Sequence, residues 1–143
     1  MEVNTTRSLG LDIGDKRMGV ALSDPQGVLA SPLTIITRQN EIADIEAIIN
    51  IISQHQVERV VVGLPRSMDG SLGNQAEKVK AFVQKLSSQT EVSVEFRDER
   101  LSTVLARRLM RAAYAKKPGK KARDDAIAAA IILQGYLDEE RFL

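Results

Sequence analysis

Acidic residues stand at three separate places in this sequence, each near an expected boundary between a regular element and a loop. Asp12 lies near the end of one apolar run, and Asp98 and Glu99 close a later one. Asp124 and Asp125 precede a long apolar stretch. A carboxylate in an apolar strand costs on the order of several kcal/mol to bury unless it is paired or bound to a metal. Three converging carboxylates could hold a pair of divalent cations, which is the chemistry of phosphodiester cleavage.

Within two of these places the sequence leaves a choice. Adjacent strand residues point to opposite faces, so only one of Asp98 and Glu99 is expected to reach the same site as Asp12. Asp124 suits the cap of a helix, because acids at a helix N-terminus bind free amides. Asp125 shares a helical face with apolar residues and is expected to point toward the core, so we assign it to the site.

The composition favours an oxygen-ligated metal. The chain has no cysteine, one histidine (His55), no tryptophan, three phenylalanines and two tyrosines. These counts exclude disulfides, a thiolate zinc site, a cysteine nucleophile and a multi-histidine metal site. They also argue against a stacking platform for single-stranded RNA. The carboxylates, lysines and hydroxyls that remain suit Mg²⁺ or Mn²⁺.

A strongly basic segment lies between two of the acidic places. From Leu101 to Arg123 there are eight of the 20 basic residues and no acid, which leaves 12 basic against 19 acidic residues elsewhere. The net charge of +1 therefore hides a positive segment set against an acidic body. Such a segment can neutralise several phosphates of a nucleic acid, although a solvated loop has the same composition. The eight residues are Arg107, Arg108, Arg111, Lys116, Lys117, Lys120, Lys121 and Arg123.

The elements that must position these residues follow from the apolar pattern. Strands are expected at 8–13, 18–23, 27–36, 59–64 and 91–98, and helices at 41–54, at about 76–86, from Ser102 or Thr103 to Met110, and from Asp124 to about Glu139. Residues 114–123 are expected to form a loop, and Pro32 indicates an edge strand or a bulge. The order βββαβαβαα predicts an α/β fold, a mixed five-stranded sheet flanked by helices, as in RNase H-like proteins. We expect one domain over residues 1–143.

Four segments together resemble the YqgF/RuvX family of bacterial proteins. They are LGLDIGDKRMGVALSD (9–24), VVVGLPRSMDGSLGNQAEKVKAFVQKL (60–86), RDERLSTVLA (97–106) and DDAIAAAIILQGYLD (124–138). The resemblance extends over almost the whole chain, in matching order and spacing. It implies an RNase H-like fold and places the family's acidic site on Asp12, Glu99 and Asp125. Members are described as Holliday-junction-resolvase-like and as nucleases that mature the 5′ end of the 16S rRNA precursor.

The sequence thus predicts a metal-dependent nuclease acting on structured nucleic acid, with Mg²⁺ or Mn²⁺ held by Asp12, Glu99 and Asp125. We expect the substrate to be RNA in ribosome maturation, with branched DNA as the alternative. Residues expected near the scissile phosphate or along the backbone are Lys16, Arg17, Arg100, Arg107, Arg111, Lys116, Lys117, Lys120, Lys121 and Arg123.

Three other functions remain open at this point. A resolvase of four-way DNA would use the same chemistry and need a stable dimer, whereas the rRNA nuclease could be a monomer or a homodimer. A non-catalytic ribosome-assembly factor would bind nucleic acid without cleaving it. An actin-like ATPase also opens with an acidic-glycine hairpin, but it needs a second domain. The longest apolar stretch, Ala126 to Leu133, is too short to span a membrane, so we expect a cytoplasmic location.

Overall fold

Nine regular elements follow one another in the computed structural model, which describes residues 7–65, 73–99, 104–114 and 120–141. The strands are β1 (Ser8–Ile13), β2 (Arg17–Ser23), β3 (Ala30–Thr37), β4 (Arg59–Leu64) and β5 (Ser93–Asp98). The helices are α1 (Glu41–Gln54), α2 (Asn74–Ser88), α3 (Val104–Tyr114) and α4 (Lys120–Arg141). Within these ranges, none of the helices combines the length and apolar composition that spanning a membrane would need.

The strands form one mixed sheet in the order β3-β2-β1-β4-β5. β1 pairs antiparallel with β2 and parallel with β4, and β4 pairs parallel with β5. This confirms the expected α/β fold. Pro32 lies in the edge strand β3, opposite a register shift between Val20 and Ala21, as its missing N–H predicts. The carboxyl ends of β1, β4 and β5 lie at the same edge of the sheet, where α/β folds place their ligand sites.

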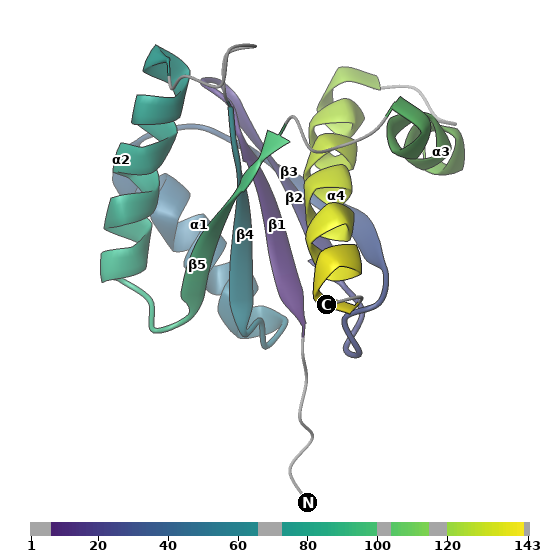
Figure 1. Cartoon of the computed structure of the whole chain (residues 1–143). Coiled ribbons are helices and arrows are strands. Elements are labelled where there is room, and N and C mark those ends of the chain that lie inside the picture. The colour runs from purple at the N-terminus through teal and green to yellow at the C-terminus, as the bar shows by residue number, and fades with distance from the viewer. Residues whose placement is uncertain (1–6, 66–72, 100–103, 115–119, 142–143) are drawn as a thin grey trace, which may run out of the picture.

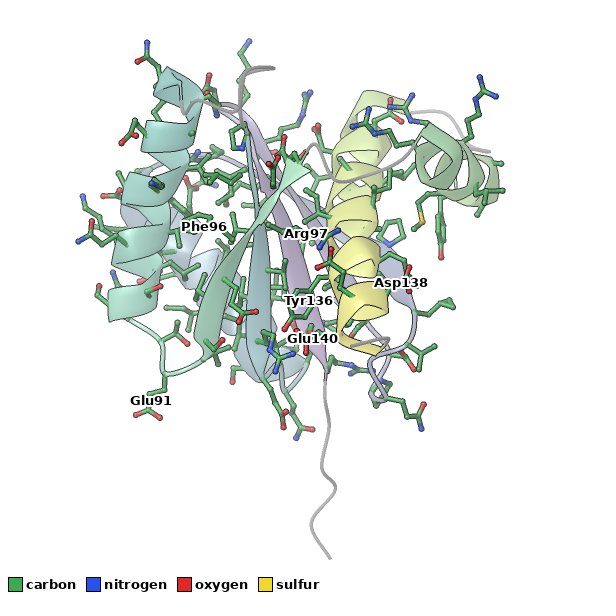
Figure 2. All side chains as sticks on the ribbon, viewed as in Figure 1. Glu91, Phe96, Arg97, Tyr136, Asp138 and Glu140 are labelled. Carbon is green, nitrogen blue, oxygen red and sulfur yellow. The ribbon has the colours of Figure 1, made fainter. Side chains whose placement is uncertain are left out.

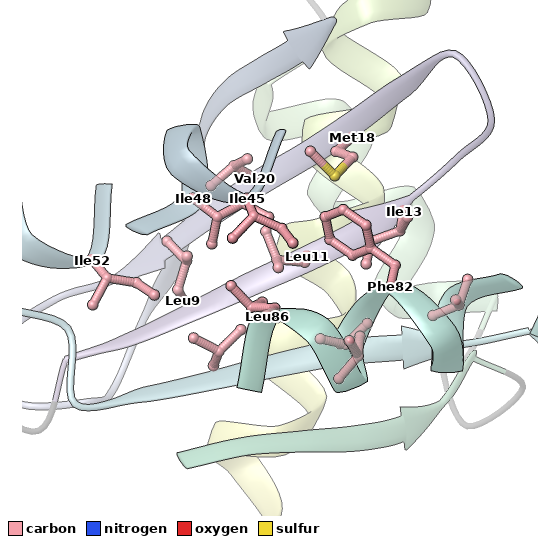
Figure 3. Packing of buried hydrophobic residues seen from close by; sticks show 14 of the residues in the cluster. Leu9, Leu11, Ile13, Met18, Val20, Ile45, Ile48, Ile52, Phe82 and Leu86 are labelled. Atoms are coloured by element: carbon pink, nitrogen blue, oxygen red, sulfur yellow. The ribbon is translucent and has the colours of Figure 1, made fainter. Parts of the chain in front are cut away.

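One face of the sheet carries large apolar side chains and is covered by α1 and α2 (Figure 1). Alternation along each strand places these side chains on the same face. Figure 3 shows Leu9, Leu11 and Val20 of the sheet packed against Ile45 and Ile48 of α1. All five are buried. This layer is the larger of the two apolar cores.

The other face carries small residues, and α4 lies directly on it (Figure 1). A Cβ atom at Gly10 would come within 2.8 Å of both the Ala129 carbonyl oxygen and the Leu133 Cβ of α4. A Cβ at Gly19 would overlap the carbonyl group of Asp125. The helix backbone therefore approaches the sheet to a distance that only glycine permits at these positions. α3 packs against the outer side of α4.

Polar contacts attach α4 to the sheet toward both edge strands, β5 and β3. On the β5 side, the Arg97 guanidinium forms an ion pair with Glu139 at 2.7 Å and lies against Gly135, whose missing side chain leaves room for it. Figure 2 shows Arg97 between β5 and α4. On the β3 side, Gln134 accepts a hydrogen bond from the Ala30 N–H and donates one to the Val28 carbonyl. These contacts fix the C-terminal half of α4 on the sheet, while Gly10 and Gly19 admit the preceding part of the helix.

The expected bounds were wrong in the basic region. α3 runs to Tyr114 instead of Met110, and α4 begins at Lys120 instead of Asp124, so residues 114 and 120–123 are helical and not part of a loop. Lysine, alanine and arginine favour helix, so the first turn KKAR extends α4 toward its N-terminus instead of forming a loop. The proposed caps Ser102 and Thr103 lie outside the described residues. In the edge strand β3, the expected start was also wrong, because residues 27–29 precede the strand and are not part of it.

The close approach of α4 to the sheet predicts a large effect of a single methyl group. Gly19→Ala should lower the free energy of unfolding by about 2 kcal/mol or more, because its Cβ would overlap helix backbone instead of a movable side chain. Urea denaturation measures the change. Gly73→Ala is the control, since Gly73 is exposed with φ −93° at the N-cap of α2, and it should cost no more than about 1 kcal/mol, the usual effect of alanine at an N-cap. Equal stability of the two variants would contradict this packing.

Candidate active site

Two of the proposed acids meet at the carboxyl edge of the sheet. Asp12 is next to the last residue of β1 and points to the α4 face, and Glu99 directly follows β5. β4 separates these strands, and its Gly63 leaves the space that Glu99 needs. A Cβ at Gly63 would come within 2.9 Å of the Glu99 Oε1. The carboxyl groups of Asp12 and Glu99 form a hydrogen bond with each other.

The electrostatics of this pair are unfavourable for two separate negative charges. Burial, followed by the charge of Glu99, raises the pKa of Asp12 to about 7, and Asp125 adds to the rise. Burial also raises the pKa of Glu99, while the hydrogen bond from Asp12 and the nearby Arg107 oppose that rise. Asp12 is therefore the proton donor of the pair. A divalent cation could take the place of this proton and satisfy both carboxylates, which is how the donor set fits Mg²⁺ or Mn²⁺.

Asp125 belongs to the same end of the sheet but has a different partner. Its Oδ2 accepts a hydrogen bond from the Arg17 Nε at 2.9 Å, in a half-buried ion pair. Its backbone lies over Gly19, which pairs with Asp12 in the sheet. The fold thus brings all three acids together. Among the described residues, however, no three acidic or histidine side chains form a ready-made metal cage.

A cavity of about 150 Å³ adjoins Asp12 and Glu99 and combines both signs of charge. Its other lining residues are Arg107, Arg111, Asp124, Ile127, Ala128, Ile131 and Ile132. The arginines come from α3, which places cationic groups opposite the acids. A phosphate bound beside the acidic pair would meet positive charge on the far wall.

Asp124 corrects an expectation. It was assigned a capping role, but α4 starts four residues earlier, so Asp124 lies inside the helix and lines the cavity. The close approach of α4 at Gly19 and the room that Gly63 leaves for Glu99 were not expected from the sequence. A signal for Gly19 existed, because small residues alternate on the α4 face of β2, at Gly19 and Ala21.

The proposed substrate-binding residues divide into three groups. Lys16 is exposed on the β1–β2 turn, Arg17 holds Asp125, and Arg107 and Arg111 line the cavity. A second group belongs to the first turn of α4, where the backbone but no side-chain position is described: Lys120, Lys121 and Arg123. A third group lies outside the described residues: Arg100, Lys116 and Lys117. The described part of the basic segment therefore faces the acids from α3.

A family model described as "RuvX: Holliday junction resolvase" matches residues 6–139. The chain belongs to the RuvX family. A protein of Dehalococcoides mccartyi named "Putative pre-16S rRNA nuclease" is 51% identical over 127 residues, 89% of this chain and 94% of the relative. A protein of the same name from Moorella thermoacetica is 48% identical over 132 residues, 92% of this chain and 94% of the relative. The expected family is thereby confirmed.

Two solved structures of other proteins have the same fold as this RuvX chain. RuvC of Thermus thermophilus in complex with a Holliday junction substrate superposes with a TM-score of 0.63 at 15% identity, over 95% of this chain and 96% of that one. The fowlpox virus Holliday junction resolvase superposes with a TM-score of 0.57 at 12% identity, over 93% and 99% of the two chains. The likeness confirms the RNase H-like fold.

The raised pKa of Asp12 predicts how stability depends on pH. Without added metal, the folded state keeps the Asp12 proton up to about pH 7, whereas the unfolded chain loses it near 3.8. Stability from this group is therefore complete below pH 4 and is lost as pH rises through 7. Asp12→Asn removes the titration, so at pH 8 it should be more stable than the wild type by about 2 kcal/mol. At pH 5 its advantage should be clearly smaller, because the stability of the wild type falls progressively between about pH 4 and pH 7.

Urea denaturation at pH 5 and pH 8 in chelator-containing buffer measures this difference. Asp24→Asn is the control, because backbone N–H groups of Leu29 and Val28 lower the pKa of Asp24. Asp24→Asn should therefore change the free energy of unfolding by the same amount at both pH values. A constant difference between Asp12→Asn and the wild type would show that Asp12 is not buried against other acids.

Proposed function

We propose that this RuvX chain is an endonucleolytic phosphodiesterase that matures the 5′ end of the 16S rRNA precursor, with residues 1–143 acting as one nuclease domain. The proposal rests on one observation. The half-buried Asp12–Glu99 pair lies near Asp125 and lines a cavity to which α3 contributes two arginines. In a family whose curated relatives are named as nucleases, this arrangement fits hydrolysis of a phosphodiester bond.

Asp12, Glu99 and Asp125 would hold Mg²⁺ or Mn²⁺. The metal supplies an activated water molecule and stabilises the leaving oxygen when it is bound. The protein supplies the rest. Asp12 and Glu99 present oxygen ligands from two strands that Gly63 allows to meet. Arg17 keeps the Asp125 carboxylate at the carboxyl edge of the sheet and offers a cation near the scissile phosphate.

The basic residues of the chain would bind the nucleic-acid backbone. Arg107 and Arg111 line the same cavity as the acidic pair, so a phosphate held by them would lie next to the ligands. Lys16 is exposed on the turn that follows β1, and it would add positive charge near the end of the strand that carries Asp12. The remaining candidates are Arg100, Lys116, Lys117, Lys120, Lys121 and Arg123. Ribosome biogenesis in the cytoplasm is the role that a pre-16S rRNA substrate would give this chain.

Resolution of four-way DNA junctions is the second candidate. The observation that favours it is the fold shared with RuvC, whose structure contains a Holliday junction substrate, together with the description of the matching family. Cleavage of a symmetric junction needs two active sites, so this function requires a stable homodimer. A strictly monomeric protein in light scattering would count against it.

The nuclease proposal predicts that cleavage depends on a divalent metal and on Asp12. Labelled pre-16S rRNA fragments, unrelated RNA and four-way DNA junctions, each with Mg²⁺ or Mn²⁺, should separate the substrates by rate. Asp12→Asn should lower the cleavage rate by about 100-fold or more, because it removes a charged metal ligand. Equal rates for this variant and the wild type would overturn the mechanism. Binding without any metal-dependent cleavage would instead support the assembly factor.

The cavity predicts which arginines of α3 contribute most. Arg107→Gln and Arg111→Gln should each lower kcat/KM about tenfold and make binding less steeply dependent on salt, because each removes a phosphate contact. Arg108→Gln is the matched control on the same helix, since the exposed Arg108 does not line the cavity. Its kcat/KM should stay within about twofold of the wild type. An equal loss in all three variants would indicate a diffuse charge effect.

A further inference from the structure

Arg38 binds the turn that joins the two central strands of the site. Its backbone N–H donates to the Lys16 carbonyl at 2.9 Å, and its Nη1 donates to the Gly14 carbonyl at 2.9 Å. Both ends of the three-residue turn, Gly14 to Lys16, are thus attached to one residue. The turn connects Asp12 on one side to Arg17 on the other.

Arg38 is itself held firmly on the opposite face of the sheet. Its Nε donates to the Asp44 Oδ2 of α1 at 3.0 Å, and its guanidinium lies over the ring of Phe82 of α2, 4.9 Å from the ring centre. The Asp44 side chain is only 3% exposed, and it also accepts from the Gln39 N–H. Figure 3 shows Phe82 beside Ile13, the last residue of β1. The turn is therefore tied to both helices of this layer.

Stability alone does not account for this arrangement. A buried ion pair loses much of its attraction to desolvation, and an uncharged pair of similar size is often as stable. What an uncharged or single-donor side chain cannot do is bind Asp44 and the Gly14 carbonyl at the same time. The planar guanidinium has separate N–H groups in fixed directions for that purpose.

We propose that Arg38 is a positioning residue, which fixes the turn carrying Asp12 and Arg17 and thereby sets these side chains against Glu99 and Asp125. It is not bonded to Asp12, Glu99 or Asp125, and it acts from the side of the turn where α1 and α2 lie. The inference rests on the proposed function, because it takes the three acids to be the metal ligands. A misplacement of catalytic groups by about 1 Å can cost as much as 100-fold in rate.

The test uses variants that remove the side-chain bond to the Gly14 carbonyl without leaving an unpaired buried charge, while the backbone bond to the Lys16 carbonyl stays. Arg38→Met/Asp44→Asn is neutral, and the new amide oxygen can still accept from the Gln39 N–H. Arg38→Lys keeps the charge beside Asp44, but its N–H groups all radiate from one nitrogen and cannot reproduce the spread of Nε and Nη1 toward Asp44 and Gly14. Lys85→Met is the matched control, because it breaks another ion pair to α1, with Glu41 at 2.6 Å, that includes no residue of the turn.

Three measurements distinguish positioning from general stability. In the double variant, hydrogen exchange at Gly14 and Arg17 should accelerate about tenfold more than the global unfolding rate explains. Mn²⁺ affinity in calorimetry without nucleic acid should fall about tenfold, and kcat should fall about 10- to 100-fold with KM within about twofold. Arg38→Lys should lose kcat in the same way, and Lys85→Met should match the wild type in all three.

Asp12→Asn in the same assays separates this proposal from the nuclease assignment. If Asp12→Asn loses Mn²⁺ binding and cleavage while the Arg38 variants keep both, the nuclease stands and the positioning role is wrong. If Asp12→Asn keeps both, the acidic site is not the active site and the positioning role falls with it. Should the double variant fail to fold, Arg38→Lys with wild-type kcat and Mn²⁺ affinity would overturn the proposal.

Discussion

The contact between α4 and the sheet is the constraint on which the rest of the structure depends. Glycine at positions 10 and 19 lets the helix backbone approach the strands directly, with no side chain between them. That approach places Asp125 over the residue paired with Asp12, and it forms the wall of the cavity beside Glu99. A helix standing one side-chain layer further out would leave the acids of the strands and of α4 too far apart to share a ligand.

The acidic cluster is held together against its own electrostatics. Asp12 and Glu99 are desolvated and share a proton, while Arg17 and Arg107 supply positive charge at the two sides. Such a site reduces the stability of the folded protein at neutral pH, a cost that active sites commonly carry. The large apolar core on the opposite face, with its tether through Arg38, supplies the rigidity that the cluster cannot provide for itself.

Membership of the RuvX family and the shared fold with RuvC agree with this arrangement, but they leave the substrate to be decided by experiment. The two candidate substrates make different demands on the same site. A four-way junction has two equivalent scissile positions, whereas one end of a precursor RNA has a single one. The oligomeric state of the protein therefore distinguishes the two substrates as well as its cleavage specificity does.

Local pattern was sufficient for much of this protein. Strands at 8–13 and 59–64 and the helix at 41–54 formed at the residues expected, because apolar periodicity is a property of neighbouring residues. The acidic positions were also visible in sequence, since carboxylates near apolar runs are unusual. The start of α4 was not, because its first turn has no large apolar residue at helical spacing to mark it. The convergence of the acids was expected, but the particular bonds, Asp12 to Glu99 and Arg17 to Asp125, were decided by the tertiary structure. Strand order and the close approach of α4 bring these residues together from distant parts of the chain.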